Sequence, residues 1–320
     1  MSAAPLGVVI VSFNTAALLD ACLRSVRAAL VETGWLEDAE VVVVDNHSAD
    51  ESVAFVRRHH PWVRLVASDV NLGFTAANNV ALAPWASGQA PCPARVLLLN
   101  PDAELLPGAL AALAAVLDAE PRTAVVGPSL RYADGRFQHG AFRFPGLVQT
   151  GLDLWPVARL ADSRLNGRYP RHRYDRGRPF DVDAVLGACM LVRADALQTV
   201  GPLDTGYFMY CEELDWCQRF RAAGWRVRCV PAAGVIHHGG ASTSRFQSTT
   251  FVHLWRSRLR YFDAHAGGIR ARLLRALVRL GFALHDRADD RAVRRGRMAA
   301  ATAAARRDAR RAVFAPAPPP

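Results

Sequence analysis

The first 130 residues alternate short apolar runs with longer amphipathic stretches. Runs this short and rich in β-branched residues predict buried strands of a parallel sheet; they cover 7–13, 41–44, 63–67, 95–99 and 124–127. Between them, apolar residues three and four positions apart predict helices, as from Leu18 to Leu30. Asn14 or Thr15 is expected to cap that helix. A later helix is expected to begin at Phe74 and to end at Ala83, before Pro84. This order predicts an α/β fold, a Rossmann-like, mostly parallel sheet with helices on both faces.

Polar residues follow three of these predicted strands. They are Ser12, Asn14, Asp45, Asn46, Asn100 and Asp102. In a parallel α/β sheet, ligands bind beyond the carboxyl ends of the strands. These side chains therefore indicate where a ligand site would lie.

The alternation stops after residue 130. Residues 131–181 are rich in arginine, proline and aromatic residues and predict a long irregular excursion. Order returns at 182–192, and residues 212–223 predict a helix that Gly224 ends. Extended runs follow at 225–230 and 233–238, and the chain after Thr250 is helical in pattern.

Basic charge is concentrated at the C-terminal end. The chain has 39 basic residues, all arginine, and a formal net charge of +10. Sixteen arginines follow Thr250, together with only five acidic residues, so the first 250 residues are close to neutral. In the predicted C-terminal helix, apolar residues share one face that arginines flank; they are Ile269, Leu273, Leu277 and Leu280. Such a helix can lie on an anionic membrane surface, or pack on the rest of the chain with its arginines in water, and both alternatives stay open.

Composition narrows the class of protein. With 320 residues, 51% of them hydrophobic, the chain can bury a substantial core. No apolar run reaches the roughly 18 residues that a membrane span needs, and no secretory leader is evident. Six cysteines without a C-x-x-C pair predict reduced, mostly buried thiols. These features predict a cytoplasmic protein, with peripheral attachment to the inner face of the cell membrane through the basic segment as an option.

Two strand-end segments contain oxygen ligands. Asp45 could accept the imide N–H of uracil or thymine, although a helix-capping or loop-fixing aspartate is the simpler explanation of this residue taken alone. Asn100-Pro101-Asp102 could hold Mg²⁺ or Mn²⁺, which prefer oxygen ligands and share their shell with substrate phosphates, but it also suits an ordinary turn.

A third acidic segment begins the helix at 212. On a helix, Glu212 and Asp215 share a side while Glu213 points elsewhere. Asp215 can pair with Arg219, which leaves Glu213 free to act as a general base. The structural alternative is a solvated acidic helix start that the helix dipole favours.

Two histidines precede two glycines at the end of the last extended run. His237 and His238 are candidate metal ligands, although histidines of a loop often have no special role.

Seven segments in this order resemble family 2 glycosyltransferases, and most of all the bacterial rhamnosyltransferase-like branch. The resemblance covers about residues 7–260, through VVIVSFN, VVVVDNHSAD, NLGFTAANN, LLLNPDAEL, GACMLVRADAL, FMYCEELDWCQR and VIHHGGAST. It implies the A-type glycosyltransferase fold, a nucleoside-diphosphate sugar as donor and usually a divalent metal, Mg²⁺ or Mn²⁺.

The resemblance also implies roles for single residues. Asp45 resembles the base-binding aspartate, and Asp102 the last acid of the family's D-x-D metal motif, where this chain has Asn100 in place of the first acid. His237 resembles the histidine that closes the metal site, with His238 as the alternative in register.

The acidic segment at 212 corresponds to the family's catalytic pair. Glu213 occupies the place of the catalytic base, which is often aspartate in the family, and Glu212 that of the acceptor-side acid, with Asp215 assigned to the same side. The remaining residues assigned to the donor are Ser12, Phe13, Asn14, Asn71, Gly73, Phe74, Asn78 and Asn100.

The expected reaction is inversion by one direct displacement. Branch resemblance points to rhamnose from a dTDP- or UDP-linked donor, and to a glycan or lipid-linked acceptor in cell-envelope polysaccharide synthesis. A catalytic domain is expected over 1–250, with a nucleotide-binding half (1–130) and an acceptor-side half (131–250). A basic helical extension (251–312) and a disordered tail (313–320) would follow.

Two other classes of protein compete with this prediction. A sugar-nucleotide pyrophosphorylase would need a glycine-rich N-terminal loop with arginine and lysine around a triphosphate, and this chain has neither such a loop nor any lysine. A non-catalytic binder of anionic polymers would use the arginines but leave the acid clusters in a near-neutral body unexplained. No nucleic-acid partner is therefore expected.

Overall fold

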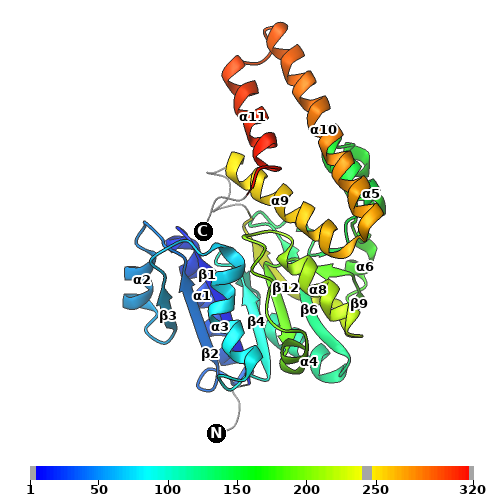
Figure 1. The fold of residues 1–320 in the computed structure, drawn as a ribbon. Helices are drawn as coiled ribbons and strands as arrows, with labels where there is room; N and C mark the ends of the chain where they lie inside the picture. Colours follow the sequence, from blue (N-terminus) through cyan, green and yellow to red (C-terminus); the bar gives the residue numbers. More distant parts are fainter. Residues whose placement is uncertain (1–4, 240–246, 317–320) are drawn as a thin grey trace. The chain divides into compact units, whose positions relative to one another are not determined.

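The structure is a computed structural model that describes residues 5–239 and 247–316 (Figure 1). It divides into two compact units. The sheet unit comprises Met1–Phe144, Arg168–Phe208 and Glu212–Ser242; the helical unit comprises Pro145–Gly167, Met209–Cys211 and Thr243–Pro320. The helical unit thus takes in part of the predicted excursion together with the C-terminal helices, while the domain bounds expected from the sequence stay a prediction.

The sheet unit is built on one mixed sheet. Its main strand order is β3-β2-β1-β4-β11-β6-β12-β5, with β7 beside β6 and β9 beside β12. The strands are β1 (Gly7–Ser12), β2 (Glu40–Asp45), β3 (Arg64–Ala67), β4 (Arg95–Leu99), β5 (Ala103–Leu105), β6 (Thr123–Arg131), β7 (Phe137–Gln138), β9 (Phe180–Asp181), β11 (Cys189–Arg193) and β12 (Arg226–His237). A separate pair joins β8 (Ala141–Phe142) to β10 (Ala184–Val185).

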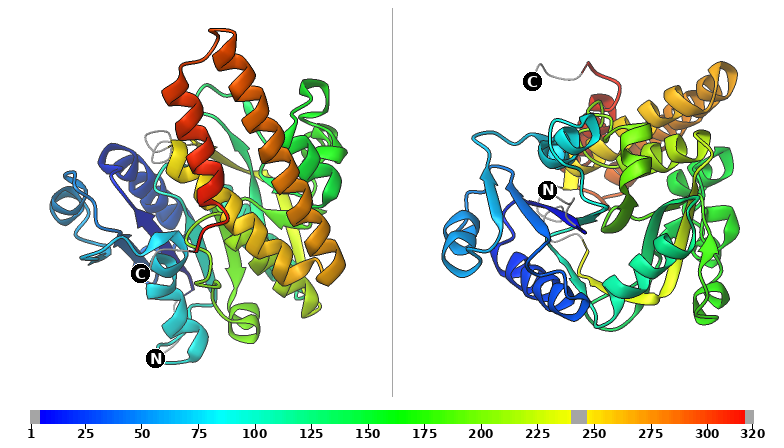
Figure 2. Two further views of the ribbon diagram at one scale, coloured as in Figure 1. Left: turned by 45° about the horizontal axis from the view of Figure 1, so that its top comes forward. Right: turned by 90° about the horizontal axis from the view of Figure 1, so that it is seen from below.

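Helices cover both faces of this sheet because side chains of a strand alternate between the faces. The helices of the sheet unit are α1 (Ala16–Thr33), α2 (Ser52–His59), α3 (Gly73–Ser87), α4 (Ala109–Ala119), α6 (Arg171–Asp175), α7 (Ala194–Val200) and α8 (Glu212–Ala222). Val8 and Ile10 join one buried cluster with α1, α2 and α4, whereas Val9 and Val11 join another with α3, α7 and α8. Figure 2 shows these two layers of helices with the sheet between them. This confirms the predicted α/β fold.

Strand β11 is the main departure from a simple parallel order. It lies between β4 and β6 and runs antiparallel to both, which was not predicted. An apolar run indicates burial but not direction. β12 is also one strand rather than two runs, with an irregularity between Val230 and Gly234.

Thr15 occupies the N-cap position of α1 as predicted, although without a side-chain cap, whereas the predicted end of α3 was wrong. Neither Asn14 nor Thr15 caps α1 through its side chain; instead Asp50 Oδ2 accepts the Ala16 N–H at 3.2 Å. Helix α3 continues through Pro84 to Ser87, because the buried Trp85 side chain fixes the last turn against the core.

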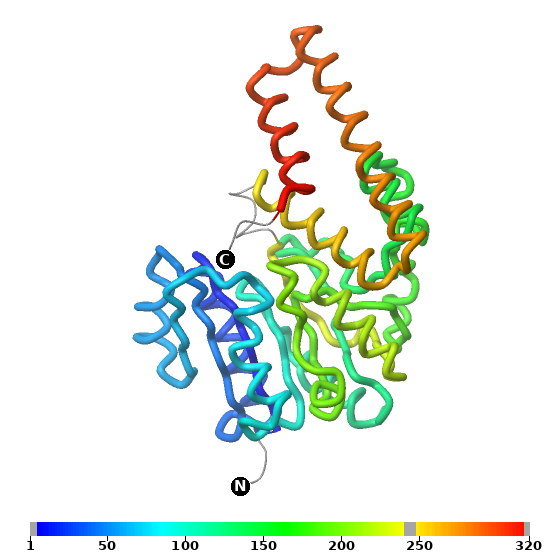
Figure 3. The backbone as a smooth tube through the Cα atoms, in the orientation of Figure 1, coloured from blue at the N-terminus to red at the C-terminus, as the bar shows by residue number. Residues whose placement is uncertain are grey.

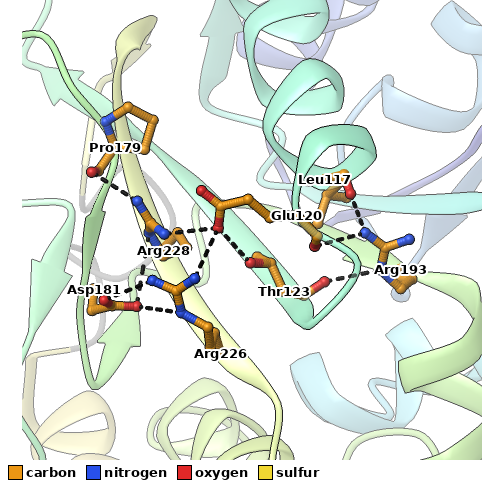
Figure 4. Close-up of polar contacts among 8 residues, drawn as sticks. All are labelled: Leu117, Glu120, Thr123, Pro179, Asp181, Arg193, Arg226 and Arg228. Atoms are coloured by element: carbon orange, nitrogen blue, oxygen red, sulfur yellow. Dashed lines mark hydrogen bonds and ion pairs between the residues drawn. The ribbon is translucent and has the colours of Figure 1, made fainter.

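An arginine–carboxylate network fastens the amino ends of β6 and β12 (Figure 4). Glu120 Oε2 accepts hydrogen bonds from Arg228 at 2.7 Å and from the Thr123 hydroxyl at 2.9 Å. Arg193 donates to the carbonyls of Thr123 and Glu120, and Arg226 pairs with Asp181. These strand ends are opposite to the carboxyl ends, so the network stabilises the sheet and is not part of the candidate site.

The helical unit contains the C-terminal helices and a short segment of the middle of the chain. Its elements are α5 (Leu147–Leu154), the 3₁₀ turns η1 (Ala158–Leu160) and η2 (Arg164–Asn166), α9 (Gln247–His265), α10 (Gly268–Arg294) and α11 (Ala300–Ala312). Arg310 pairs with Asp286 and Asp289 and so ties α11 to α10, while Arg256 donates to the Ala312 carbonyl and ties α9 to α11. Figure 3 follows the chain through these helices.

No helix among the described residues is long and apolar enough to cross a lipid bilayer. Of the tail expected to be disordered, residues 317–320 lie outside the described residues.

Candidate active site

The strand-end residues that the sequence predicts lie along one edge of the sheet. β1 runs parallel to β2 and β4, and Ser12 is directly opposite Asp45 in the register. β12 runs parallel to β6, and both run in the direction of β4 because β11 is antiparallel to β4 and to β6. The segment that holds Asp102 and the end of β12 at His237 therefore share an edge with Ser12 and Asp45.

Asp45 has one carboxylate oxygen in use and one without a partner. Its Oδ1 accepts the Ser48 N–H at 2.9 Å, which fixes the loop after β2. Its Oδ2 is buried and has no hydrogen-bond partner. A buried carboxylate oxygen without a donor is costly unless a ligand supplies one. The geometry therefore accommodates both roles considered for Asp45, loop fixing and binding an N–H.

The loop after β1 is bonded to the loop after β2. Asn14 has φ +54° and its Oδ1 accepts the Ala49 N–H at 2.7 Å, while the Asn14 N–H donates to Ser48 Oγ at 2.9 Å. The buried Ser12 hydroxyl lies 3.0 Å from Thr15 Oγ1, and Phe13 between them is partly buried. These bonds pre-form the shape of the loops beside Asp45.

The turn before α3 is also joined to the end of β2. The Asn46 side chain donates to Asn71 Oδ1 at 2.9 Å and accepts the Leu72 N–H at 2.8 Å. Gly73 has φ +79°, and a Cβ there would lie 2.6 Å from Phe208, so only glycine fits. The Phe74 N–H donates to the Phe208 carbonyl at 2.8 Å.

Two asparagines in the predicted donor set differ in the way their side chains are used. Asn78 is buried in α3 and donates to the Phe74 carbonyl at 2.8 Å, so its observed role is local. Asn100 follows β4, and its Oδ1 is buried without a hydrogen-bond partner. Asn100 therefore has a buried acceptor atom without a partner.

Asp102 and His237 lie together, as the resemblance implies. His237 Nε2 is 3.4 Å from Asp102 Oδ1, and both residues are buried. His237 Nδ1 lies 3.1 Å from Gln138 Oε1, which orients the ring. His238 instead contacts Glu104, with Nε2 2.8 Å from Oε1. Of the two histidines, His237 is thus the one beside Asp102.

These groups fit a divalent cation that shares its coordination with a substrate. Asp102 offers a carboxylate, His237 an imidazole nitrogen, and Asn100 a free amide oxygen next to β4. The described residues contain no group of three or more His, Cys, Asp or Glu side chains that would hold a metal by themselves. A small number of protein ligands completed by phosphate oxygens is the usual arrangement for Mg²⁺.

Glu213 lies at the start of α8, next to the segment that leads into β11. A Cβ added to Gly187 would be 3.6 Å from Glu213 Cβ, so the two residues are neighbours. The carbonyl of Ala188, the next residue, accepts the Asn100 N–H at 2.9 Å. This short series of contacts brings Glu213 to the segment that contains Asp102.

Glu212 is buried and Glu213 is half-buried, and burial raises the pKa of both carboxyl groups. Burial raises the pKa of the Glu213 carboxyl to about 7. Burial, and then repulsion from Glu213, raise the pKa of Glu212 well above its usual value. Because the two adjacent carboxyl groups repel each other as anions, the pair favours holding one proton between them near neutral pH. A pKa of about 7 is compatible with the predicted role of Glu213 as a base.

Asp215 has a structural partner. Arg219 Nε donates to Asp215 Oδ2 at 2.7 Å, and the same guanidinium donates to the carbonyls of Val200 and Pro202. The predicted pair is confirmed, and the structure offers no separate sign of the acceptor-binding role assigned to Asp215, which stays a prediction.

Activity should rise with pH through about 7 if Glu213 is the base. Below its pKa the carboxyl is protonated and inactive, so we expect kcat/KM to increase about tenfold per pH unit up to about 7 and then to level off. Release of nucleoside diphosphate, measured from pH 5.5 to 8.5, gives this profile. Calorimetric donor affinity over the same range separates proton transfer from donor binding. A flat profile, or one that falls as pH rises to 7, would contradict the assignment.

Some supporting residues could not be found from the sequence. Gln138, which contacts His237, lies in β7 within the excursion expected to be irregular, and no pattern marks it. Gly187 is part of the GACMLVRADAL segment, but only the fold brings it beside Glu213.

Comparisons with known proteins show the family and the fold of the chain. The family described as "Glycosyl transferase family 2" matches residues 7–201. An N-acetylglucosaminyl-diphospho-decaprenol L-rhamnosyltransferase of Mycobacterium tuberculosis is 31% identical over 252 residues, which are 73% of this chain and 78% of that protein. "Rhamnosyltransferase WbbL" of Escherichia coli is 41% identical over 80 residues, which are 25% of this chain and 30% of that protein.

Solved structures share the fold at low sequence identity. A mannosyltransferase from Pyrobaculum calidifontis in complex with GDP-Man and Mn²⁺ has a TM-score of 0.54 and 16% identity, covering 98% of this chain and 86% of that one. GalNAc-T7 with UDP, GalNAc and Mn²⁺ has a TM-score of 0.55 and 19% identity, covering 72% of this chain and 42% of that one. The fold is thus the A-type glycosyltransferase fold. The family match over residues 7–201 and the 31% identical mycobacterial relative show that the chain belongs to glycosyltransferase family 2.

Proposed function

We propose that this chain is an inverting glycosyltransferase that moves rhamnose from a dTDP- or UDP-linked donor to a hydroxyl group of a glycan or lipid-linked glycan. The observation that carries this proposal is a shared sheet edge. It brings the ionisable Glu213, the Asp102–His237 pair and the free Asp45 oxygen to neighbouring segments. Sugar transfer needs a base that deprotonates the acceptor hydroxyl, a site that neutralises the charge of the diphosphate, and a site that binds the nucleobase.

The proposed reaction is one displacement at the anomeric carbon. Glu213 takes the proton of the acceptor hydroxyl as its oxygen bonds to the anomeric carbon, while the bond to the diphosphate oxygen breaks on the opposite side. Asp102 and His237, with Asn100 beside them, would hold Mg²⁺ or Mn²⁺ together with the diphosphate. When bound, the cation neutralises charge on the leaving diphosphate.

The nucleoside would bind at the ends of β1 and β2. Asp45 Oδ2 can accept the imide N–H of thymine or uracil, which adenine and cytosine do not offer. The loops at Ser12–Asn14 and Asn71–Phe74 are held by hydrogen bonds beside it. A pre-formed site loses little conformational entropy when it binds.

The sugar and the acceptor are proposed from the relatives. Relatives named as rhamnosyltransferases favour rhamnose, and the name of the mycobacterial relative refers to a decaprenol-linked acceptor. A lipid-linked acceptor would place this chain in the cytoplasm at the inner face of the cell membrane, within cell-envelope polysaccharide synthesis. Within the chain, we assign nucleotide binding to residues 1–130, acceptor binding to residues 131–250 and membrane contact to the basic segment 251–312.

A donor screen tests this proposal. Purified full-length protein is incubated with dTDP-rhamnose and with UDP- and GDP-linked sugars, a soluble acceptor and either Mn²⁺, Mg²⁺ or EDTA. We expect nucleoside diphosphate to be released most rapidly from a dTDP or UDP donor and only with metal present. Release that needs pyrophosphate and yields a nucleoside triphosphate would identify a pyrophosphorylase instead, and no donor turnover with any sugar would contradict the proposal.

A further inference from the structure

Exposed apolar side chains are concentrated on the helical unit. Of the eleven large hydrophobic side chains that are exposed in the described residues, eight belong to this unit. They are Leu147, Val148, Trp155, Val157, Leu165, Ile269, Leu273 and Leu280. Clustered exposed apolar residues on a folded protein indicate an interaction surface.

Helix α10 has two apolar faces. One is buried and contains Leu274, Val278 and Phe282. At 100° per residue, Ile269 and Leu273 lie on the opposite side of the helix, where they are 79% and 53% exposed. The stripe noted in the sequence is thus not the face by which α10 packs, and most of it is left in solvent.

Helix α5 lies beside α10 and adds to this surface (Figures 1 and 2). A Cβ added to Gly281 would be 2.7 Å from Leu154 Cδ1, so glycine permits the close approach of the two helices. The Trp155 ring lies 6.2 Å from the His285 ring. Val148 of α5 remains 59% exposed. Two segments more than a hundred residues apart in sequence thus contribute to it.

Arginines flank the exposed apolar residues, and they outnumber the exposed Asp162 of the same turns. Arg159, Arg164, Arg270 and Arg272 have no ion pair among the residues that the structure describes. Several carboxylates of the unit are already used internally, since Asp263 pairs with Arg275, and Asp286 and Asp289 pair with Arg310. The surface is therefore apolar and basic together.

We propose that this surface, formed by α5, the turns after it and the exposed face of α10, binds an anionic lipid bilayer. Leucine, isoleucine, valine and tryptophan would enter the headgroup region while the arginines contact anionic lipids. Pairing with a second copy of this chain would instead bring arginines against arginines. Nucleic acid would pair with the charge but leave the apolar side chains without a partner. The purpose of this contact, access to a lipid-linked acceptor, rests on the proposed function.

Vesicle co-sedimentation of the full chain tests this proposal. We expect binding to phosphatidylcholine vesicles that contain 30% phosphatidylglycerol in 0.1 M NaCl. Binding to pure phosphatidylcholine should be at least about tenfold weaker. Binding to the anionic vesicles should also be weaker in 0.5 M NaCl than in 0.1 M NaCl. The double variant Ile269→Asp/Leu273→Asp should bind at least about tenfold less tightly, because two exposed apolar groups of α10 become charged.

A matched variant gives the control. Val31→Asp changes a valine of the sheet unit that is 60% exposed, and it should bind vesicles as the unchanged chain does. Vesicle binding by the double variant that equals that of the unchanged chain, or equal loss in the Val31 variant, would overturn the proposal. So would light scattering that shows a dimer of the unchanged chain and a monomer of the double variant, with vesicle binding unaltered.

Transfer to a water-soluble acceptor separates this proposal from the proposed function. The double variant should keep that activity within about twofold, because both substituted side chains are exposed on α10, outside residues 131–250, to which we assign the acceptor. Lost vesicle binding with retained transfer supports the surface. Absent transfer in the unchanged chain with intact vesicle binding would count only against the proposed function.

Discussion

Substitution of Glu213 by glutamine is expected to lower kcat by about 10³-fold and to leave donor affinity within about twofold. A general base typically contributes 10²- to 10⁴-fold, and glutamine keeps the shape of the side chain but accepts no proton. Donor affinity should persist because the nucleoside and diphosphate contacts assigned to Asp45 and Asp102 are made by other segments. Rapid-quench turnover and calorimetry with dTDP donors measure the two quantities.

A conservative variant supplies the control for this prediction. Glu213→Asp keeps a carboxylate but moves it back by one methylene, so we expect an intermediate rate rather than the loss seen with glutamine. Turnover of Glu213→Gln at the rate of the unchanged chain would remove Glu213 from the reaction, whatever the donor affinity.

Substitution of Glu213 by glutamine should also change how the free energy of unfolding depends on pH. Because burial raises the folded-state pKa from its usual value to about 7, the folded state holds a proton that the unfolded state has lost between these values. The stability that this group contributes is therefore complete below the usual carboxyl pKa and is lost as pH rises through about 7. Glu213→Gln should accordingly melt higher than the unchanged chain at pH 8.5, and the difference should shrink as the pH falls toward the usual carboxyl pKa.

Substitution of Asp102 by asparagine is expected to weaken donor binding in Mn²⁺ by about 100-fold, with little change in EDTA. The carboxylate would be the only charged protein ligand of the cation, so its loss removes most of the attraction between protein and metal. Calorimetry with and without Mn²⁺ measures this directly and does not depend on turnover. Equal donor affinity for the variant and the unchanged chain in Mn²⁺ would contradict a metal role for Asp102.

The two adjacent histidines provide a matched pair for the same test. His237→Ala should share the metal-dependent defect, because His237 lies beside Asp102. His238→Ala should keep donor affinity, because the His238 ring contacts Glu104 instead. If His238→Ala and not His237→Ala weakened metal-dependent donor binding, His238 would be the metal ligand.

The sheet and its functional edge were predictable because the sequence signals there are local. Continuous apolar runs end in polar residues at Ser12, Asp45 and Asn100, and parallel strands place such ends together. Helix α8 was equally clear, since the acid cluster, the pair of Asp215 with Arg219 and the final Gly224 all follow from spacing along one helix.

Tertiary features were not predictable in the same way. The run at β11 indicates a buried strand, but nothing in it fixes an antiparallel direction between β4 and β6. On α10, two apolar faces compete, and the periodicity alone does not say that Leu274 is buried while Leu273 is exposed. The raised pKa of Glu213 likewise depends on burial that only the assembled fold provides.

The most direct test of the proposed active site is a crystal structure of the full chain with Mn²⁺ and dTDP or UDP, with data collected at the manganese absorption edge. We expect an anomalous peak within coordination distance of Asp102 and His237. We also expect the imide N–H of the base to donate to Asp45 Oδ2 and the Glu213 carboxylate to face the diphosphate. A nucleotide bound elsewhere, or Glu213 separated from the diphosphate by the body of the protein, would contradict it.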